Sequence, residues 1–388
     1  MRDRRSNIAR HDAAQRFRDL GVDLYLGEGQ FTSETTLEVG GRKLEFAKAV
    51  VATGARAAMP PIPGLAEAGV LTNQTIFSLT ELPPRLLVVG GGPIGSEMAQ
   101  SFARFGSKVI LVEGSKGVLG NDDPRAGEVV AASMKRDGVE IVHRGRVSKV
   151  ELVGSVRRVT VDTASGAQVF EAEQVLVATG RAPNVDGIGL ESAGVEFDSR
   201  RGVHVDDCLR TTNKRIFAAG DVGSSYKFTH AADFLARTVL RNALFFGRAK
   251  ASSLVFPWAT YTDPEVAHVG LTEALAKEQG VDHGIIEIDL VDNDRAVLED
   301  EDEGFVKIVH DSKGRVLGGT VVASHAGEMI GELVAAVQNG STLGQMATVI
   351  HPYPTVADAI RRAGDAFNKT RLTPGKAKLL AWILKMRR

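Results

Sequence analysis

Leu86-Leu-Val-Val-Gly-Gly-Gly-Pro-Ile-Gly95 is the stretch that decides the fold, because an apolar strand runs directly into three spaced glycines. Gly90 permits the tight turn, Gly92 lets a pyrophosphate approach the backbone, and Gly95 lets the next helix pack closely on the strand. Pro93 suits the first helical turn, where its missing N–H would have no partner. The stretch therefore predicts a strand–turn–helix unit that binds a dinucleotide.

A helix and a second strand complete this unit. We expect a helix over Ile94–Phe105, whose positive N-terminal end faces the phosphates, and a strand over Lys108–Glu113. Glu113 lies eighteen positions after Gly95, close to the ~20 expected for the acid that accepts from a ribose 2′-hydroxyl. A carboxylate there repels a 2′-phosphate, so NAD is favoured over NADP, with Lys116 as the counter-signal. A glycine turn in an unrelated α/β fold is the alternative interpretation.

The length, net charge and cysteine count of the chain exclude several classes of function. The 388 residues exceed the ~250–300 that one core supports. A net charge of -1 gives no reason to expect a nucleic-acid partner, and no apolar run reaches the ~20 residues that span a bilayer. We therefore expect a cytoplasmic protein without a nucleic-acid or membrane partner. The single cysteine, Cys208, excludes a disulfide or cysteine-rich metal site within the chain, and no metal site is expected.

Further elements follow from the pattern of apolar, glycine and proline residues. We expect a polar helix, short strands that include a hairpin around Gly40-Gly41, and apolar strands that end on glycines. The expected helix is 7–20 and the strands are 22–26, 35–39, 43–46, 49–54, 175–180 and 216–220. Prolines in 59–64 indicate a crossing between domains. After Phe256 the pattern is α+β, with strands 305–310 and 316–323 and a helix 328–338.

Several motifs occur in one order along the chain: Thr53-Gly54, Thr179–Asn184, Ala218–Asp221 and Thr262–Glu265 with Val269-Gly270. Together they closely resemble the pyridine nucleotide-disulfide oxidoreductases, which include dihydrolipoamide dehydrogenase, glutathione reductase and mercuric reductase. The segments His351–Thr355 and Asn368–Pro374 are most similar to the mercuric-reductase-like branch. The resemblance covers essentially the whole chain.

The resemblance implies an α/β fold with two nucleotide-binding, Rossmann-like domains, the first truncated at its N-terminus, and a C-terminal α+β dimerisation domain. The implied order is a remnant of the FAD domain (1–80), the NAD(P) domain (81–206), a return to the FAD domain (207–250) and the dimerisation domain (251–388). It implies an FAD-dependent homodimer that passes hydride from NADH to flavin and on to a small-molecule acceptor.

The resemblance also assigns cofactor contacts. Thr53 and Gly54 lie beside the FAD, Gly220 and Asp221 at its ribityl and phosphate region, Gly180 in the NAD pocket, and Glu97 faces the nicotinamide. For Asp221 the alternative is a carboxylate that caps a helix or a loop. Because Asp221 follows an apolar strand to the carboxyl edge of a sheet, where ligands bind in open α/β sheets, the FAD contact is favoured.

The chain departs from the family pattern near its start. The family opens with a glycine fingerprint for FAD and a Cys-x-x-x-x-Cys pair, and neither precedes the polar helix here. We therefore expect FAD to lack its main phosphate donors and the first sheet to expose apolar surface. Cys208 lies in a segment that matches a strand, so packing is the expected role of its side chain.

A second departure concerns the acid–base motif. The family pattern His-x-His-Pro-Thr-x-x-Glu is here His351-x-Tyr353-Pro-Thr-x-x-Asp358. Tyrosine titrates near ~10, so Tyr353 is a poor base at neutral pH. Tyr353 and Asp358 are the catalytic candidates, with Asp358 orienting the hydroxyl and both acting across the dimer interface. His351 is expected to be a surface or packing residue.

The C-terminal residues Lys376–Arg388 interleave apolar and basic side chains. A membrane-surface helix is one interpretation, and a helix packed on the dimerisation domain is the favoured one. Two alternatives to the main function stay open: a diaphorase-like transfer from flavin to an acceptor without cysteines, and a non-catalytic NAD-binding dimer or truncated gene product that cannot hold FAD.

Overall fold

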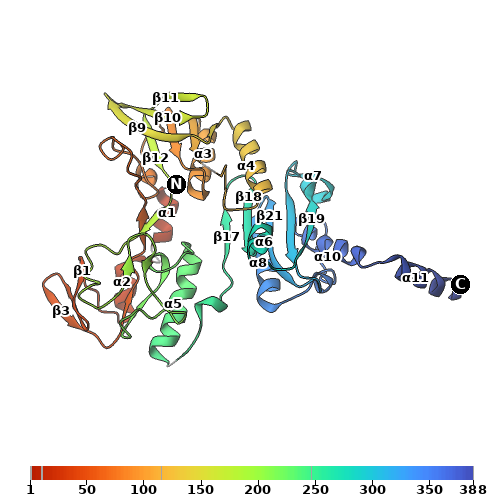
Figure 1. Cartoon of the computed structure of the whole chain (residues 1–388). Coiled ribbons are helices and arrows are strands. Elements are labelled where there is room, and N and C mark those ends of the chain that lie inside the picture. The colour runs from red at the N-terminus through yellow and green to blue at the C-terminus, as the bar shows by residue number, and fades with distance from the viewer. Residues whose placement is uncertain (1, 10–11, 115, 246, 388) are drawn as a thin grey trace. The chain divides into compact units, whose positions relative to one another are not determined.

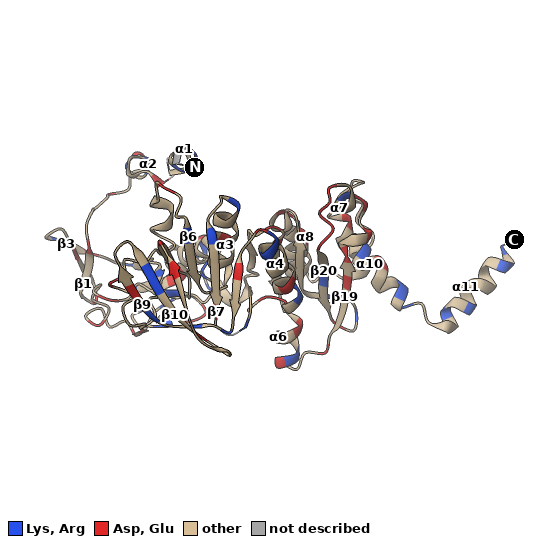
Figure 2. Cartoon of the chain, turned by 90° about the horizontal axis from the view of Figure 1, so that it is seen from above, with Lys and Arg blue, Asp and Glu red and all other residues tan. Residues whose placement is uncertain are grey.

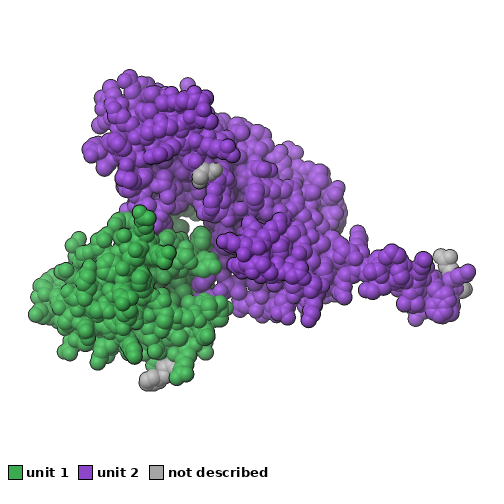
Figure 3. All heavy atoms as spheres, in the orientation of Figure 1, with its two compact units in different colours: residues 1–56, 182–253 green, residues 57–181, 254–388 purple. Residues whose placement is uncertain are grey.

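The computed structural model describes residues 2–9, 12–114, 116–245 and 247–387. Its residues fall into two compact units, 1–56 with 182–253 and 57–181 with 254–388, which Figure 3 colours green and purple. Unit 1 is interrupted in sequence by part of unit 2.

The described part of unit 1 contains short strands and α-helices. A three-stranded antiparallel sheet has the order β1-β2-β3, β4 pairs in parallel with β16, and β14 pairs with β15. The bounds are α1 (Arg2–Ala9), α2 (Ala14–Asp19), β1 (Gly29–Ser33), β2 (Thr36–Val39), β3 (Arg42–Glu45), β4 (Ala49–Val51), β14 (Phe197–Asp198), β15 (Gly202–Val203), β16 (Ile216–Ala218) and α5 (Thr229–Leu244). The connecting strands β5 (Ala55–Ala57) and β13 (Arg181–Pro183) pair with each other.

The hairpin predicted around Gly40-Gly41 is confirmed. Both glycines have positive φ values of 56° and 75°, which a β-carbon would disfavour, and they join β2 to β3. As expected, apolar surface is exposed in this unit: Val50, in the middle of β4, is 45% exposed.

Three predictions fail in unit 1. Residues 22–26 form no strand, and the polar helix is divided into α1 and α2, with 10 and 11 outside the described residues. Ala13 precedes α2 with an extended backbone, which interrupts the helix. Cys208 lies in a turn rather than a strand, because its N–H donates to Oδ1 of Asp206 and its carbonyl accepts from Asn242.

Unit 2 begins with a parallel sheet of order β12-β6-β7-β8 (Figure 1). The bounds are β6 (Arg85–Val89), α3 (Pro93–Arg104), β7 (Lys108–Glu113), α4 (Pro124–Arg136), β8 (Glu140–His143) and β12 (Gln174–Val177). The strand–turn–helix–strand unit predicted from Leu86 onward is confirmed, and side chains such as Leu86, Val88 and Leu111 are fully buried in its core. The simple alternation of strands and helices expected after it is wrong, because a three-stranded antiparallel sheet of β9 (Arg146–Val153), β10 (Val156–Thr163) and β11 (Gly166–Ala172) intervenes.

The rest of unit 2 is a five-stranded antiparallel sheet of order β17-β18-β21-β20-β19, packed against α8 and α10. The bounds are β17 (Pro257–Thr260), β18 (Glu265–Gly270), α6 (Glu273–Glu278), β19 (Gly284–Asp289), α7 (Asp294–Leu298), β20 (Phe305–His310), β21 (Val316–Ala323), α8 (Ala326–Asn339), α9 (Leu343–Met346), α10 (Asp358–Thr370) and α11 (Pro374–Met386). The strands predicted at 305–310 and 316–323 match β20 and β21. The α+β character is confirmed.

The predicted packing of the C-terminal helix is wrong. None of the residues of α11 is buried. Within the described residues, no helix combines the length and the apolar character that crossing a membrane requires.

Candidate functional site

The glycine turn between β6 and α3 has two packed positions and one open position. A β-carbon on Gly90, whose φ is 105°, would lie 2.7 Å from the carbonyl oxygen of Ala178, and one on Gly95 would lie 1.9 Å from that of Gly90. A β-carbon on Gly92 would meet nothing within 4 Å. The outer glycines therefore let the strand, the helix and β12 approach, and Gly92 leaves space beside the backbone for a ligand.

This open position lies at a helix end suited to an anion. Gly92 is the N-cap of α3, and Pro93 begins the helix, followed by Ile94. The first N–H groups of a helix lack intrahelical partners and carry a positive partial charge, so the end of α3 can accept a pyrophosphate.

Glu113, the last residue of β7, contacts the glycine turn through its side chain. Its Oε2 accepts the backbone N–H of Gly91 at 2.7 Å, and its Oε1 accepts that of Lys116 at 3.3 Å. The ammonium of Lys116 donates to Oδ1 of Asn121 at 3.1 Å. The carboxylate is thus held beside the turn, where a ribose hydroxyl bound to the same nucleotide could reach it.

Glu97, one turn into α3, contacts the segment between β17 and β18. Its Oε1 accepts the N–H of Tyr261 at 2.9 Å. Burial raises the pKa of the Glu97 carboxyl, and the hydrogen bond from Tyr261 partly offsets that rise. A carboxyl with a raised pKa in a nucleotide-binding region is a candidate for a functional role.

The segment between β17 and β18 also binds two further polar side chains on this face of α3. The buried amide of Gln100 donates to the carbonyl of Asp263 at 2.9 Å and accepts its N–H at 2.8 Å. Arg104 donates to Oδ2 of Asp263 at 2.7 Å. The sequence analysis missed Tyr261 and Asp263. The only signal was the i, i+3, i+7 spacing of three polar side chains on a helix that otherwise packs on a sheet.

Gly180 follows β12 and extends this region. Its carbonyl accepts the N–H of Ala58 at 2.9 Å, and its φ is 128°. The preceding Thr179 lies 3.3 Å from the position that a β-carbon on Gly90 would take. The structure therefore brings Gly180 near the turn formed by 90–95.

Unit 1 brings together the other four predicted cofactor residues. In the parallel pair, Val51 of β4 is opposite Ala218 of β16, so Gly54 and Gly220 both follow the carboxyl ends of neighbouring strands. Thr53 donates to the carbonyl of Asn184 at 2.7 Å, and the N–H of Asn184 donates to that of Gly54 at 2.9 Å.

Asp221 is almost fully buried in the turn that follows β16. Lys227 donates to its backbone carbonyl at 3.0 Å. Gly220, with a φ of 76°, lets the chain turn at this edge.

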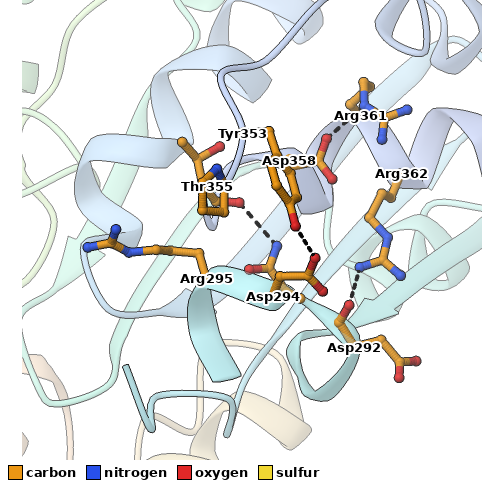
Figure 4. Close-up of a pocket in the computed structure, with 10 residues that line it drawn as sticks. Asp292, Asp294, Arg295, Tyr353, Thr355, Asp358, Arg361 and Arg362 are labelled. Atoms are coloured by element: carbon orange, nitrogen blue, oxygen red, sulfur yellow. Dashed lines mark hydrogen bonds and ion pairs between the residues drawn. The ribbon is translucent and has the colours of Figure 1, made fainter. Parts of the chain in front are cut away.

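Tyr353 lines a pocket of 270 Å³ at the ends of α7 and α10 (Figure 4). Its hydroxyl donates to Oδ2 of Asp294 at 2.6 Å, and this carboxylate raises the pKa of Tyr353. Asp358 also lines the pocket, but its Oδ1 accepts from Arg361 at 2.7 Å. The expectation that Asp358 orients the hydroxyl is therefore corrected: Asp294, from another helix, does so.

His351 has an acidic partner that the sequence analysis did not foresee. Its Nε2 lies 2.8 Å from Oε2 of Glu332, and its side chain is only 7% exposed. Glu332 belongs to α8, and its other oxygen is buried without a hydrogen-bond partner in the described structure. His351 is thus a packing residue, as expected, and is tied to a carboxylate.

The sequence matches two models of one protein family. Residues 6–234 match the pyridine nucleotide-disulphide oxidoreductase model, and 256–363 match its dimerisation domain. The chain belongs to the pyridine nucleotide-disulphide oxidoreductase family. This membership confirms the fold class predicted from the motifs, a mixed α/β fold of nucleotide-binding domains with a dimerisation domain.

The similar proteins include enzymes named as reductases and as a dehydrogenase. Mercuric reductase from Bacillus cereus is 38% identical over 354 residues, which are 90% of this chain and 56% of that protein. Dihydrolipoyl dehydrogenase from Staphylococcus aureus is 34% identical over 349 residues, 89% and 74% of the two chains. The HOCl-induced flavoprotein disulfide reductase RclA from Escherichia coli is similar in structure, with a TM-score of 0.84 and 27% identity over 94% of this chain and 84% of that one. The chain thus spans little more than half the length of the Bacillus mercuric reductase.

Proposed function

We propose that this chain is the NADH-binding and dimer-forming part of an FAD-dependent oxidoreductase, which transfers hydride from NADH to flavin and on to a small-molecule acceptor. The observation that carries the proposal is the glycine turn at 90–95. There Gly90 and Gly95 are required by packing, while Gly92 faces open space at a helix N-terminus. The transfer to flavin and on to an acceptor is inferred from membership of the family.

In this proposal, the N-terminal end of α3 binds the pyrophosphate of NADH at Gly92, Pro93 and Ile94. Glu113 accepts a hydrogen bond from the adenosine ribose and repels a 2′-phosphate, which favours NADH over NADPH. Glu97 and Gly180 line the nicotinamide end. The hydrogen bond from Tyr261 positions Glu97, because it fixes one of its carboxylate oxygens.

FAD would contact Thr53, Gly54, Gly220 and Asp221 of unit 1. These residues fit a flavin nucleotide because they lie at the carboxyl ends of two parallel strands, where nucleotides bind in open α/β sheets. When bound, FAD supplies two-electron chemistry between hydride and acceptor. Cys208 is the single cysteine of the sequence, so the residues of this chain supply no dithiol for the acceptor step.

Tyr353 and Asp358 are the proposed catalytic residues on the acceptor side, working across the interface of a homodimer formed by the dimerisation domain. A phenol is protonated at neutral pH, and the hydrogen bond to Asp294 raises the pKa of Tyr353 further. Tyr353 then acts through a neutral hydroxyl oxygen that is aimed by Asp294, and not as a general base. Asp358 holds Arg361 at the floor of the same pocket.

The test is reconstitution of the purified full chain with FAD, followed by gel filtration and NADH-dependent reduction of a dye. The proposal expects a yellow protein whose flavin absorbance is bleached by NADH. Retention of the dye reduction in the absence of any added thiol would identify the diaphorase-like form of the activity. A protein that stays colourless after reconstitution contradicts both forms.

A non-catalytic NAD-binding dimer is the second candidate. It is favoured by one observation: among the described residues, the turn at 90–95 is the strand–glycine–helix phosphate cradle, and unit 1 presents no equivalent. Calorimetric titration separates the two, because NADH binding without FAD binding supports this candidate.

A further inference from the structure

Helix α11 (Pro374–Met386) has its own start signal. Thr373 is the N-cap, its hydroxyl accepts the N–H of Lys376 at 3.4 Å, and Pro374 begins the first turn. Ser and Thr at the N-cap and Pro at the first helical position are strong helix-start signals. The sequence therefore specifies a helix here.

This helix lacks a partner within unit 2. It has 13 residues, none of which is buried. Isolated helices shorter than ~12–15 residues are only marginally stable in water, and most helical stability comes from packing an apolar face. The matched dimerisation domain covers 256–363 and ends before α11 begins.

One side of α11 is an apolar stripe. Leu379, Trp382, Ile383 and Met386 have the i, i+3, i+4, i+7 spacing that places side chains on one helix face. Leu379 and Trp382 are each 56% exposed, and Met386 is 63% exposed. An exposed tryptophan within such a stripe suits a boundary between water and an apolar phase, because its ring is apolar and its N–H is polar.

Basic side chains border the stripe on both sides. Lys378 and Lys385, seven residues apart, follow one edge, and Lys376 and Arg387, eleven residues apart, follow the other. The sequence contains no aspartate or glutamate after Asp365, and Figure 2 shows α11 with blue segments and no red ones. Long basic side chains can extend their charged ends outward while their stems cover apolar surface.

We propose that α11 binds the surface of an anionic lipid bilayer, with the stripe of Leu379, Trp382, Ile383 and Met386 at the acyl boundary and the bordering basic side chains on lipid phosphates. Apolar area and attraction to anionic headgroups together determine the strength of such binding. The helix lies on the membrane and does not cross it, because 13 residues span only about 20 Å of a hydrocarbon core about 30 Å thick. This proposal departs from the expectation of a protein without a membrane partner.

Two other occupants fit less well. A nucleic acid would match the positive charge but would leave the apolar stripe in water. A second copy of the chain would cover the stripe, but it would not explain why the charged residues of this segment are all basic. Leu384 lies on the opposite side of α11 with Ala377 and Ala381, and Leu380 lies next to the border of Lys376 and Arg387.

The test is co-sedimentation of the full chain with vesicles of phosphatidylcholine alone or with about 30% phosphatidylglycerol. We expect binding at least tenfold tighter to the anionic vesicles, loss of that binding in about 0.5 M NaCl, and a blue shift of Trp382 fluorescence on binding. Equal or undetectable binding to both vesicle types overturns the proposal.

A matched pair of variants locates the lipid-facing side. Ile383→Asp places a charge in the stripe and should abolish binding and the blue shift, whereas Leu384→Asp places the same charge on the opposite side and should retain most of both. Because α11 has no buried residue, neither variant should change the thermal unfolding of the protein. If Leu384→Asp is as damaging as Ile383→Asp, or if either variant changes the oligomer mass in sedimentation velocity, a second copy covers the helix and the proposal is wrong.

Discussion

The hydroxyl of Tyr353 donates a 2.6 Å hydrogen bond to Oδ2 of Asp294, at the edge of a pocket that Arg295, Asp358 and Arg362 also line. A carboxylate that accepts this hydrogen bond opposes the formation of a negatively charged phenolate beside it. It therefore raises the pKa of the phenol. The deprotonation of Tyr353 is thus made harder by a carboxylate of α7.

Replacement of this carboxylate should release the phenol. In Asp294→Asn the hydrogen bond loses its charged acceptor, so the pKa of Tyr353 should fall towards the ~10 of a free tyrosine. The titration is followed by phenolate absorbance, with the curve of Tyr353→Phe subtracted to isolate one of the four tyrosines. Asp292→Asn is the control, since the backbone carbonyl of Asp292, and not its side chain, accepts from Arg362. A Tyr353 titration that is the same in Asp294→Asn and the wild type would show that this hydrogen bond has no effect in solution.

Coenzyme preference should depend on Glu113. Glu113→Ala removes a charged hydrogen-bond acceptor from the ribose, which should weaken NADH binding about tenfold and narrow its advantage over NADPH. Lys116→Ala should leave the ratio of the two dissociation constants within about twofold, because Asn121 already engages its ammonium. Titration of both nucleotides against both variants checks this, and a ratio that responds to Lys116 alone would show that the preference is misassigned.

Acid should destabilise unit 2 through His268. Burial lowers the pKa of His268 to about 4, and its ring nitrogens are bonded to Thr320 and to the carbonyl of Gly270. In the unfolded chain histidine titrates near ~6.5. As the pH falls from about 6.5 to about 4, the unfolded state takes up a proton that the folded state refuses, so the free energy of unfolding drops by about 3 kcal/mol.

Urea unfolding at several pH values measures this contribution. His268→Gln should lose the component of the acid dependence between about pH 6.5 and pH 4, while carboxylates continue to contribute at lower pH. If the variant and the wild type lose stability in parallel over that range, the burial of a neutral His268 does not account for the acid dependence.

Local signals predicted the nucleotide-binding unit well. Strand 108–113, the helix after Pro93 and the spacing to Glu113 all depend on neighbours within thirty residues, and the structure matches them. The antiparallel strands between 146 and 172 were missed because apolar and polar residues alternate only weakly along them. Residues 22–26 were read as a strand because the segment is apolar, yet it pairs with no other strand.

The candidate site was harder to predict where it depends on contacts between distant segments. Asp294 and Tyr353 are 59 positions apart, and Glu97 and Tyr261 are 164 apart, so no spacing rule connects them. The partner of Glu97 is also a backbone N–H, which every residue except proline carries, so no residue type could reveal it. By contrast, the packing roles predicted for Gly90 and Gly95 match the close contacts around them, and the contact of Gly92 with a pyrophosphate stays a prediction.

The most direct test of the account is calorimetric titration of the full chain with NADH, compared with Gly92→Ala. A methyl group at 92 meets no protein atom within 4 Å, so the variant should unfold at nearly the same temperature as the wild type. The same methyl would occupy the space assigned to the pyrophosphate, so NADH affinity should fall at least tenfold. Gly95→Ala, whose methyl would lie 1.9 Å from a backbone oxygen, should instead lower the unfolding temperature as well. The account predicts NADH binding that Gly92→Ala weakens at least tenfold without loss of stability. NADH binding that is undetectable in the wild type, or unchanged in Gly92→Ala, would contradict it.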